Sequence, residues 1–272
     1  MSNQTDSLVS AVVFDWAGTT VDFGSRAPMG AFVEAFAEFG VEISVEEARA
    51  PMGLPKRDHI KALGAMPRVS EAWKDARGAA FGESDIDALY EIFVPLNVEV
   101  VGRHADVIPG VVESVQALRA RGIKIGSTTG YVREIMAPLV PKAAEQGYAP
   151  DNLVCAGDLA QGRPTAMMMY RCFLDLDVWP AASVVKVDDN EPGIAEGLAA
   201  GCWTVGIAMT GNQVGLSRDE LDALPPAERT ARRDKAVATL KRSGAHFVID
   251  GVGDLLPVID EIEGRLRRGD RP

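Results

Sequence analysis

The chain has 272 residues, of which 47% are hydrophobic, and its 28 basic and 39 acidic residues give a formal charge of −11. This composition supports a packed core, and the net negative charge argues against a protein that binds nucleic-acid phosphates. No apolar run approaches the roughly 20 residues that cross a membrane, and the polar start Met1 to Ser7 lacks the apolar run of a signal peptide. Three cysteines without C-x-x-C spacing favour free thiols in a reducing compartment. We therefore predict a cytoplasmic protein without a nucleic-acid or membrane partner.

Predicted strands and helices alternate along most of the chain. A β-branched apolar run at 8–15, ending on an acid, predicts the first buried strand. From residue 28 to about 104 the pattern shows only amphipathic helices, punctuated by glycine and proline. Beyond residue 106, strands are predicted at 123–128, 153–155, 183–187, 203–207 and 246–249, and helices at 111–121, 131–146, 166–176, 194–200 and 255–266.

Two further segments carry structural expectations. Pro138 and Pro141 should kink or break the helix at 131–146, because proline removes a helical hydrogen bond. The charged segment 217–241 should form exposed helices.

The order of elements predicts an α/β fold: a doubly wound, Rossmann-like parallel sheet core with an inserted all-helical cap domain. The core domain would comprise residues 1–24 and 105–272, and the helical cap domain residues 25–104. Ligands of such sheets bind at the carboxyl ends of the strands. Polar residues that follow predicted strands are therefore the candidates for a functional site.

Four polar motifs occupy such positions. Asp15 ends the first strand before the small residues AGTT, so its carboxylate could attack phosphorus while backbone N–H groups approach an anion. The segment STTG at 127–130 offers hydroxyl and backbone N–H groups to a phosphate. Arg163 would neutralise phosphate oxygens. Asp188 and Asp189 offer the oxygen ligands that Mg²⁺ prefers.

Each motif alone has a simpler interpretation, such as a turn-capping Asp, a helix-capping Thr, a solvated Arg or an acid cluster at a helix N-terminus. In this order, at the ends of parallel strands, the four resemble the haloacid dehalogenase superfamily. Its motifs are a nucleophilic Asp, a Ser or Thr, a Lys or Arg, and an acidic metal pair. The resemblance implies a hydrolase that uses Mg²⁺.

One position departs from the phosphatases of this superfamily, which usually carry a second Asp two residues after the nucleophile. Here that residue is Ala17, so a phosphate ester would lack the acid that protonates its leaving alcohol, worth about 10²–10⁴ in rate. The helical segment offers another route in PMGLPKRDH, where Lys56 and His59 share one helix face. A desolvated lysine forms a Schiff base with an aldehyde, so that carbon can leave phosphorus as an enamine. A solvated surface lysine is the competing interpretation of Lys56.

The strings FDWAGTTVD, PMGLPKRDH, IGSTTGY, GRP and VKVDD together resemble the phosphonatase branch of the superfamily, from about residue 8 to 262. The resemblance implies a homodimer that cleaves the carbon–phosphorus bond of a small-molecule phosphonate, phosphonoacetaldehyde, in the degradation of 2-aminoethylphosphonate. The implied roles are Asp15 as nucleophile and metal ligand, the Ala17 carbonyl and Asp189 as further metal ligands, Lys56 as Schiff-base lysine, Thr129, Gly130 and Arg163 at the phosphoryl group, and Met52, His59 and Tyr131 beside the imine.

Three positions leave alternatives open. The second metal acid expected after Asp189 is replaced by Gly193, so Asp188 or Glu191 would take its place. Lys186, in an otherwise apolar strand, is either a buried charge partner or a strand-end residue that reaches solvent, and the second interpretation is favoured. His59 is either a proton shuttle or a hydrogen-bonded histidine on the helix surface.

Two rival functions remain. One is another enzyme of this fold: a phosphatase or phosphomutase, against which Ala17 counts, or a dehalogenase, which would leave Lys56 unexplained. The other is a non-catalytic binding protein. Ala17 and Gly193, which stand where acids are expected, favour this function, but a binding protein would not need the nucleophile Asp15.

Overall fold

The computed structural model describes residues 7–272, so nearly all of the polar start, Met1 to Asp6, lies outside the described part. One parallel sheet in the order β3-β2-β1-β4-β5-β6 forms the centre of the molecule. This confirms the Rossmann-like class, and each predicted strand is present, three of them shortened. The strands are β1 (Ala11–Phe14), β2 (Lys124–Thr129), β3 (Val154–Cys155), β4 (Val184–Asp188), β5 (Trp203–Ile207) and β6 (Phe247–Ile249).

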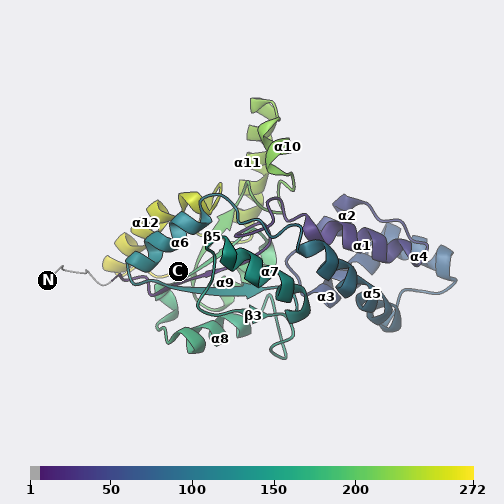
Figure 1. Ribbon diagram of the computed structural model, residues 1–272, viewed down its shortest axis with the longest axis horizontal. Helices are drawn as coiled ribbons and strands as arrows, with labels where there is room; N and C mark the ends of the chain where they lie inside the picture. Colours follow the sequence, from purple (N-terminus) through teal and green to yellow (C-terminus); the bar gives the residue numbers. More distant parts are fainter. Residues whose placement is uncertain (1–6) are drawn as a thin grey trace.

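Helices cover both faces of the sheet. Side chains alternate along β1, so that Val12 and Phe14 belong to one apolar cluster and Ala11 and Val13 to another. Figure 1 shows the first face under α6 and α12 and the second over α8. Since both faces are covered, β1 is apolar at every position. The helices of this part are α6 (Val111–Ala120), α7 (Arg133–Glu145), α8 (Met167–Leu176), α9 (Glu191–Ala199) and α12 (Leu255–Arg267).

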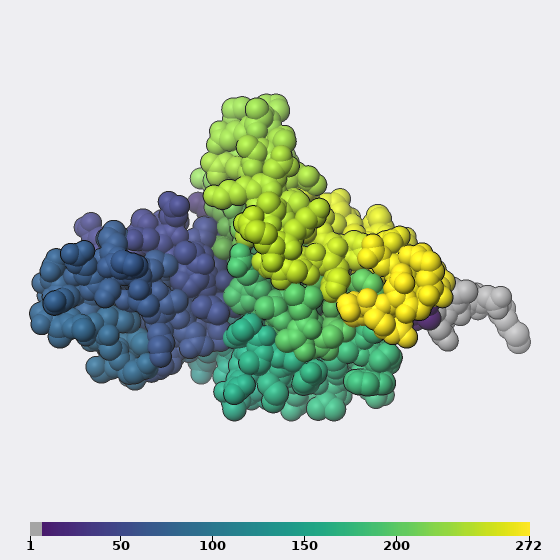
Figure 2. All heavy atoms as spheres, turned by 180° about the vertical axis from the view of Figure 1, so that it is seen from behind, coloured from purple at the N-terminus to yellow at the C-terminus, as the bar shows by residue number. Residues whose placement is uncertain are grey.

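The segment between β1 and α6 contains helices and no strand among its described residues, as predicted. These helices form the lobe at the purple and blue end of Figure 2, beside the sheet and its helices. Aromatic side chains fill it: Phe32 stacks on Phe93 with ring centroids 4.2 Å apart, and Trp73 is buried. The helices are α1 (Ala27–Ala37), α2 (Val45–Arg49), α3 (Lys56–Gly64), α4 (Pro67–Arg77) and α5 (Glu83–Val101).

Pro138 and Pro141 were predicted to kink or break the helix at 131–146. A break is wrong, because α7 runs continuously through both prolines, and a kink stays a prediction. The carbonyls that lose their helical partners belong to Glu134 and Ala137, four residues earlier. Both residues are exposed, so water can hydrogen-bond these carbonyls. An exposed helix surface therefore tolerates both prolines.

The charged segment after β5 forms α10 (Arg218–Asp222) and α11 (Pro226–Arg242), which project from the sheet at the top of Figure 1. Most of their residues are exposed, as predicted, and Leu221, Ala236 and Leu240 anchor them. Among the described residues, no helix combines the length and apolar character needed to cross a bilayer.

Candidate active site

The sheet register brings the polar motifs together. Phe14 pairs with Ser127 on one side and with Val187 on the other, so the next residue of each strand lies at the same edge. The Asp15 backbone N–H donates to the carbonyl of Val187 at 3.0 Å, and the Asp15 side chain points out of the sheet end with only 5% of the residue exposed. This edge is the topological switch point, where ligands of such sheets bind.

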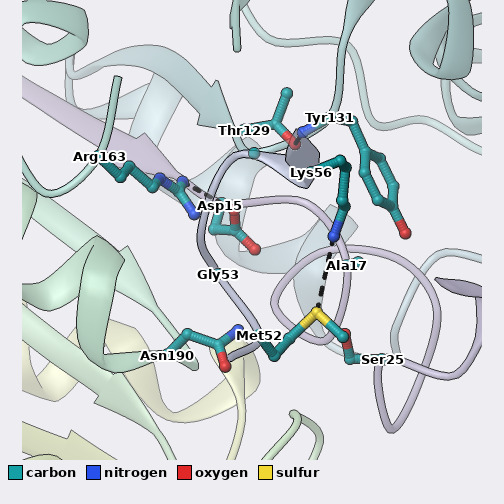
Figure 3. Close-up of a pocket in the computed structure, with 11 residues that line it drawn as sticks. Asp15, Ala17, Ser25, Met52, Gly53, Lys56, Thr129, Tyr131, Arg163 and Asn190 are labelled. Atoms are coloured by element: carbon teal, nitrogen blue, oxygen red, sulfur yellow. Dashed lines mark hydrogen bonds and ion pairs between the residues drawn. The ribbon is translucent and has the colours of Figure 1, made fainter. Parts of the chain in front are cut away.

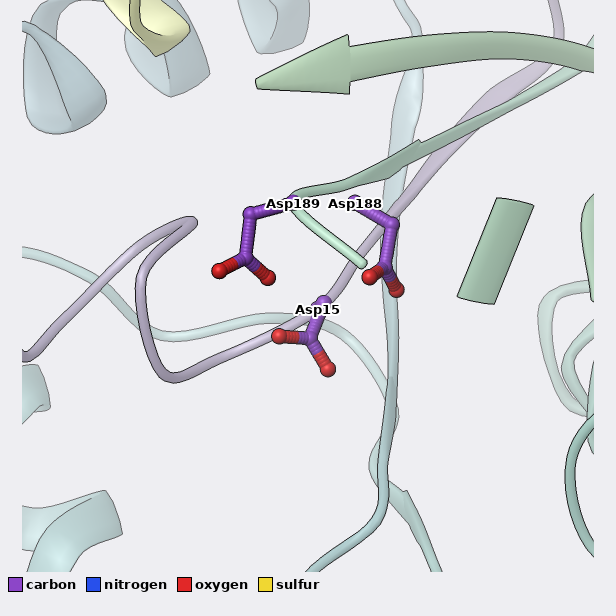
Figure 4. Close-up of side chains that lie close together, drawn as sticks. All are labelled: Asp15, Asp188 and Asp189. Carbon is purple, nitrogen blue, oxygen red and sulfur yellow. The ribbon is translucent and has the colours of Figure 1, made fainter. Parts of the chain in front are cut away.

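Three carboxylates converge at this edge. One oxygen from each of Asp15, Asp188 and Asp189 lies within 4.8 Å of the others (Figure 4). Burial, followed by the charge of Asp188, raises the pKa of Asp15 to about 6, although Arg163 opposes the rise. Burial and the charges of Asp15 and Asp188 raise the pKa of Asp189 well above its usual range. A divalent cation would offset this repulsion, and an all-oxygen donor set suits a hard cation.

Of the two acids that could replace the second metal acid, Asp188 belongs to the carboxylate cluster. A Cβ at Gly193 would lie 1.9 Å from Asp188 Oδ2, so the Asp188 carboxylate fills the space that a side chain at 193 would need. Asp188 Oδ2 has no aligned hydrogen-bond donor among the described residues. Glu191, the alternative, is exposed and lies outside the carboxylate cluster.

Arg163 contacts both the carboxylates and Thr128. Its Nη2 lies 2.8 Å from Asp15 Oδ1 and 3.3 Å from Asp188 Oδ2, and donates to the Thr128 carbonyl at 3.0 Å. Its Nε lies 3.2 Å from Oε2 of Glu196, a buried residue of α9. These ion pairs keep the pKa of the guanidinium above its usual range, against the cost of burial. Arg163 is therefore a permanent positive charge beside the predicted nucleophile.

Lys186 is a buried charge partner, and the favoured interpretation of a residue that reaches solvent is wrong. Its Nζ lies 3.1 Å from Asp188 and 3.4 Å from Glu196, and donates to Thr128 Oγ1 at 2.7 Å. β4 lies between β1 and β5 in the middle of the sheet, which leaves its side chains no path to water. The charge of Lys186 therefore offsets the acids within the core.

Lys56 faces the same space from the helical lobe. It begins α3, and only 3% of it is exposed. Its Nζ lies 4.9 Å from the ring centre of Tyr131 and 5.6 Å from that of Phe32, and 3.7 Å from Met52 Sδ. Burial lowers the pKa of the ammonium to about 7, and nearby acids such as Asp15 only partly oppose this. The interpretation as a solvated surface lysine is therefore wrong.

A small cavity lies between Lys56 and the side chains of Asp15 and Arg163. Figure 3 shows Asp15 and Arg163 on one side and Lys56, Met52 and Tyr131 on the other. The complete lining is Asp15, Ala17, Ser25, Met52, Gly53, Lys56, Thr129, Gly130, Tyr131, Arg163 and Asn190. Sequence reasoning missed three of these, Ser25, Gly53 and Asn190. Only Asn190 had a signal, since it follows the acid pair.

The loop before α3 closes one side of the cavity. Gly53 has φ +92°, and a Cβ there would lie 2.8 Å from Asn190 Cβ, so only glycine fits between lobe and sheet. Arg49 of α2 makes a second connection. Its Nη1 donates to the Gly24 carbonyl at 2.8 Å and to Asn212 Oδ1 at 2.9 Å, and the Asn212 backbone N–H donates to Asp189 at 2.6 Å. The docked lobe thus contacts the carboxylate cluster through one intermediate residue.

His59 lies behind the cavity and is not part of its lining. Its Nε2 is 2.8 Å from the Ala48 carbonyl, which can only accept, so Nε2 carries the proton. The ring stacks on Phe32 at 4.0 Å, and burial lowers the pKa of the imidazole well below its usual value. Its Nδ1 has no partner among the described residues. His59 is thus buried and neutral rather than on the surface, and its role as a proton shuttle stays a prediction.

Comparisons with known proteins agree with this geometry. A family model for a haloacid dehalogenase-like hydrolase matches residues 9–201. Phosphonoacetaldehyde hydrolases of Paraburkholderia phytofirmans and Klebsiella pneumoniae are 55% and 50% identical, over 97% of this chain and 99% of each relative. The crystal structure of a phosphonoacetaldehyde hydrolase like protein from Oleispira antarctica is 44% identical, with a TM-score of 0.96 over 98% of this chain and 97% of that chain. The chain therefore belongs to the haloacid dehalogenase-like hydrolases and, within them, to the phosphonoacetaldehyde hydrolase family.

Proposed function

We propose that this enzyme hydrolyses phosphonoacetaldehyde to acetaldehyde and phosphate through a Schiff base on Lys56 and an aspartyl phosphate on Asp15, in the degradation of 2-aminoethylphosphonate. The observation that carries the proposal is the shared cavity, which Asp15 and Arg163 line from one side and a desolvated Lys56 from the other. A phosphonate with an aldehyde group offers one function to each side.

The first step is condensation of the neutral Lys56 amine with the aldehyde, with loss of water. The pKa of about 7 leaves a large fraction of Lys56 unprotonated near neutral pH. Once protonated, the imine can accept the electron pair of the carbon–phosphorus bond. In this role Lys56 replaces the acid that Ala17 cannot supply, because the enamine leaves without needing a proton.

The second step is attack of Asp15 on phosphorus. A P–O bond forms, the C–P bond breaks, and its electron pair moves into the enamine. Arg163 stabilises the charge on the phosphoryl oxygens. The enamine then takes up a proton and hydrolyses to acetaldehyde, and water cleaves the aspartyl phosphate to release phosphate.

The cluster of Asp15, Asp188 and Asp189 suits a divalent cation such as Mg²⁺, which phosphoryl transfer commonly uses. Asp15, Asp189 and the Ala17 carbonyl would hold Mg²⁺, with Asp188 as the second acid of the β4 end. The ion would supply positive charge to the phosphoryl oxygens. Supporting observations are the convergence of three carboxylates and the raised pKa of Asp189.

The remaining lining residues would position the substrate. Thr129 and Gly130 would hold the phosphoryl group, while Met52 and Tyr131, with His59 behind them, would surround the imine. We propose that residues 25–104 act as a cap that opens to admit substrate and closes to exclude water. The contacts of Gly53 and Arg49 with the sheet side support such a closed state.

A turnover assay tests this function. The protein with Mg²⁺ is mixed with phosphonoacetaldehyde, and acetaldehyde and phosphate are measured separately. We expect the two products in equal amounts, and none after Mg²⁺ is chelated. Lys61→Ala should leave the release of both products unchanged, because Lys61 lies on the same helix as Lys56 but is exposed and pairs with Glu83. Release of neither product from the folded, Mg²⁺-loaded protein would refute the proposal.

We further propose that the enzyme is a cytoplasmic homodimer. Met167, Tyr170 and Leu174 present an apolar face of α8 to solvent, and Leu174 and the nearby Trp179 are 79% and 80% exposed. Such a patch is typical of a subunit interface. The three buried free cysteines fit a reducing compartment.

The dimer proposal makes a prediction for Leu174→Glu. A charge in the apolar patch should shift the protein from dimer to monomer in sedimentation at micromolar concentration. Arg171→Glu, at an exposed charged position of the same helix, is the control. A monomeric wild-type protein would contradict the homodimer. A dimer unaffected by Leu174→Glu would place the interface elsewhere.

A further inference from the structure

Glu196 is a buried acid that none of the four motifs contains. It lies on α9 with no exposed surface. Its Oε2 accepts from Thr128 Oγ1 at 2.8 Å and lies 3.2 Å from Arg163 Nε and 3.4 Å from Lys186 Nζ. It is not one of the three clustered carboxylates and does not line the cavity. It can therefore act on the site only through the residues that it contacts.

The contacts divide the Arg163 guanidinium into two parts. Nε lies beside Glu196, which does not line the cavity, whereas Nη2 lies beside Asp15, Asp188 and the Thr128 carbonyl. A guanidinium is planar and rigid, so contacts at Nε and Nη2 fix both its position and its rotation. Without the Nε contact, the charges of Asp15 and Asp188 would be the main attraction on Arg163.

We propose that Glu196 is a positioning residue, which holds Arg163 through Nε and so fixes the rotation of the guanidinium, with Nη2 kept beside Asp15 where the phosphoryl group would bind. Lys186 and Thr128 complete the arrangement, since each contacts Glu196 and keeps its charge compensated within the core. The proposal rests on the proposed function only in that the cavity binds a phosphoryl group.

The test measures binding of inorganic phosphate to the Mg²⁺-loaded protein by calorimetry, with kcat and KM as a second readout. Glu196→Gln keeps the shape and an acceptor oxygen but removes the charge. We expect phosphate affinity to fall about tenfold and kcat/KM about 100-fold, whereas Glu228→Gln, which removes an exposed ion pair with Arg232, changes neither. Glu196→Asp, with the charge kept but the reach shortened, should fall between Gln and wild type.

A double-mutant cycle separates positioning from a general structural role. Arg163→Lys has no Nε to hold, so adding Glu196→Gln to it should cost less than about twofold further in phosphate affinity. If the two substitutions together reduce phosphate affinity by the product of their separate effects, the proposal is overturned. Wild-type phosphate affinity in Glu196→Gln would overturn it as well. If Glu196→Gln does not fold, the same cycle is run with Glu196→Asp, and wild-type phosphate affinity in that variant overturns it equally. Failure of the proposed function would show instead as wild-type protein that binds phosphate without releasing acetaldehyde.

Discussion

The two sides of the cavity are equally buried but are built on opposite electrostatic principles. On the sheet side, four buried carboxylates, those of Asp15, Asp188, Asp189 and Glu196, meet two buried cations, Arg163 and Lys186. On the lobe side, Lys56 lies among Phe32, Tyr131 and Met52, and no acid in the described part of the chain forms an ion pair with it. The first arrangement has an excess of negative charge that a divalent cation can balance. The second has one charge, that of Lys56, which desolvation destabilises.

The difference shows how one small cavity supports two chemistries. A phosphoryl group needs fixed positive charge and an ionised nucleophile, which the sheet side supplies once a cation is bound. An aldehyde needs a neutral amine, which an apolar surrounding favours. Lys56 comes from the helical lobe and the carboxylates come from the sheet ends, so the amine and the anionic site can be disrupted separately.

The largest effect is expected from Lys56→Arg. Arginine keeps a positive charge but cannot form the imine, so phosphate release should fall by about 10⁴-fold or more. Phosphate binding should stay within a few fold of wild type, because the sheet side is unchanged. Coupled assays for phosphate measure the rate, and Lys61→Arg is the control. Near-normal turnover by Lys56→Arg would show that the two sides are not both needed.

Asp188→Asn should disrupt the sheet side. Removing one charge from the cluster should weaken Mg²⁺ binding by at least about 10–100-fold, as measured by calorimetry. Glu191→Gln is the matched control, because Glu191 was the other candidate and is exposed. The assignment of Asp188 would be contradicted by the reverse pattern, with binding lost in Glu191→Gln and kept in Asp188→Asn.

The rate of turnover should depend on pH near neutrality, because Lys56 on the lobe side gains or loses its proton there. The reactive form of Lys56 is the neutral amine, and its pKa is lowered to about 7, so protonation removes this form as the pH falls through that value. With Mg²⁺ saturating, kcat/KM should rise about tenfold per pH unit below this pKa and level off above it. The check is a pH–rate profile across neutrality. A midpoint near the ordinary lysine value of 10.5 would contradict desolvation of Lys56.

The smallest effect is expected where the two sides meet. Arg49→Ala removes the hydrogen bonds to Gly24 and Asn212, at a cost of about 1–3 kcal/mol in the docked state. KM should rise about tenfold with a smaller change in kcat. Arg57→Ala, which removes exposed ion pairs on the lobe, is the control. Unchanged KM in Arg49→Ala would mean that this contact does not hold the lobe in place.

Sequence patterns predicted the sheet, the helical lobe and the polar motifs of Asp15, Thr129 and Arg163, because each depends on local periodicity or on a residue that follows a strand. The roles of Ala17, Met52, Gly130 and Tyr131 came instead from the resemblance to the phosphonatase branch. Asp15, Thr129 and Arg163 all lie after predicted strands or in the loops between them, and parallel pairing brings such positions together. The same patterns could not predict burial of a charged residue. Lys186 looked like a strand-end residue because nothing local shows that Asp188 and Glu196 surround it.

Other details depend on three-dimensional packing that no spacing reveals. Asp188 could be favoured over Glu191 only once the overlap between Asp188 and a side chain at Gly193 was visible. Ser25 comes from the segment that joins β1 to α1, and it lines the cavity only because that segment folds back over the sheet edge. The tolerance of α7 for two prolines likewise depends on which side of the helix faces solvent.

Borohydride trapping tests the central claim, the imine on Lys56, most directly. The Mg²⁺-loaded enzyme is reduced in the presence of phosphonoacetaldehyde and then digested for peptide mass mapping. We expect a reduced adduct on the peptide containing Lys56, no adduct on Lys61, and loss of activity in proportion to labelling. An active enzyme that is neither labelled at Lys56 nor inactivated by borohydride with substrate would contradict the Schiff-base mechanism.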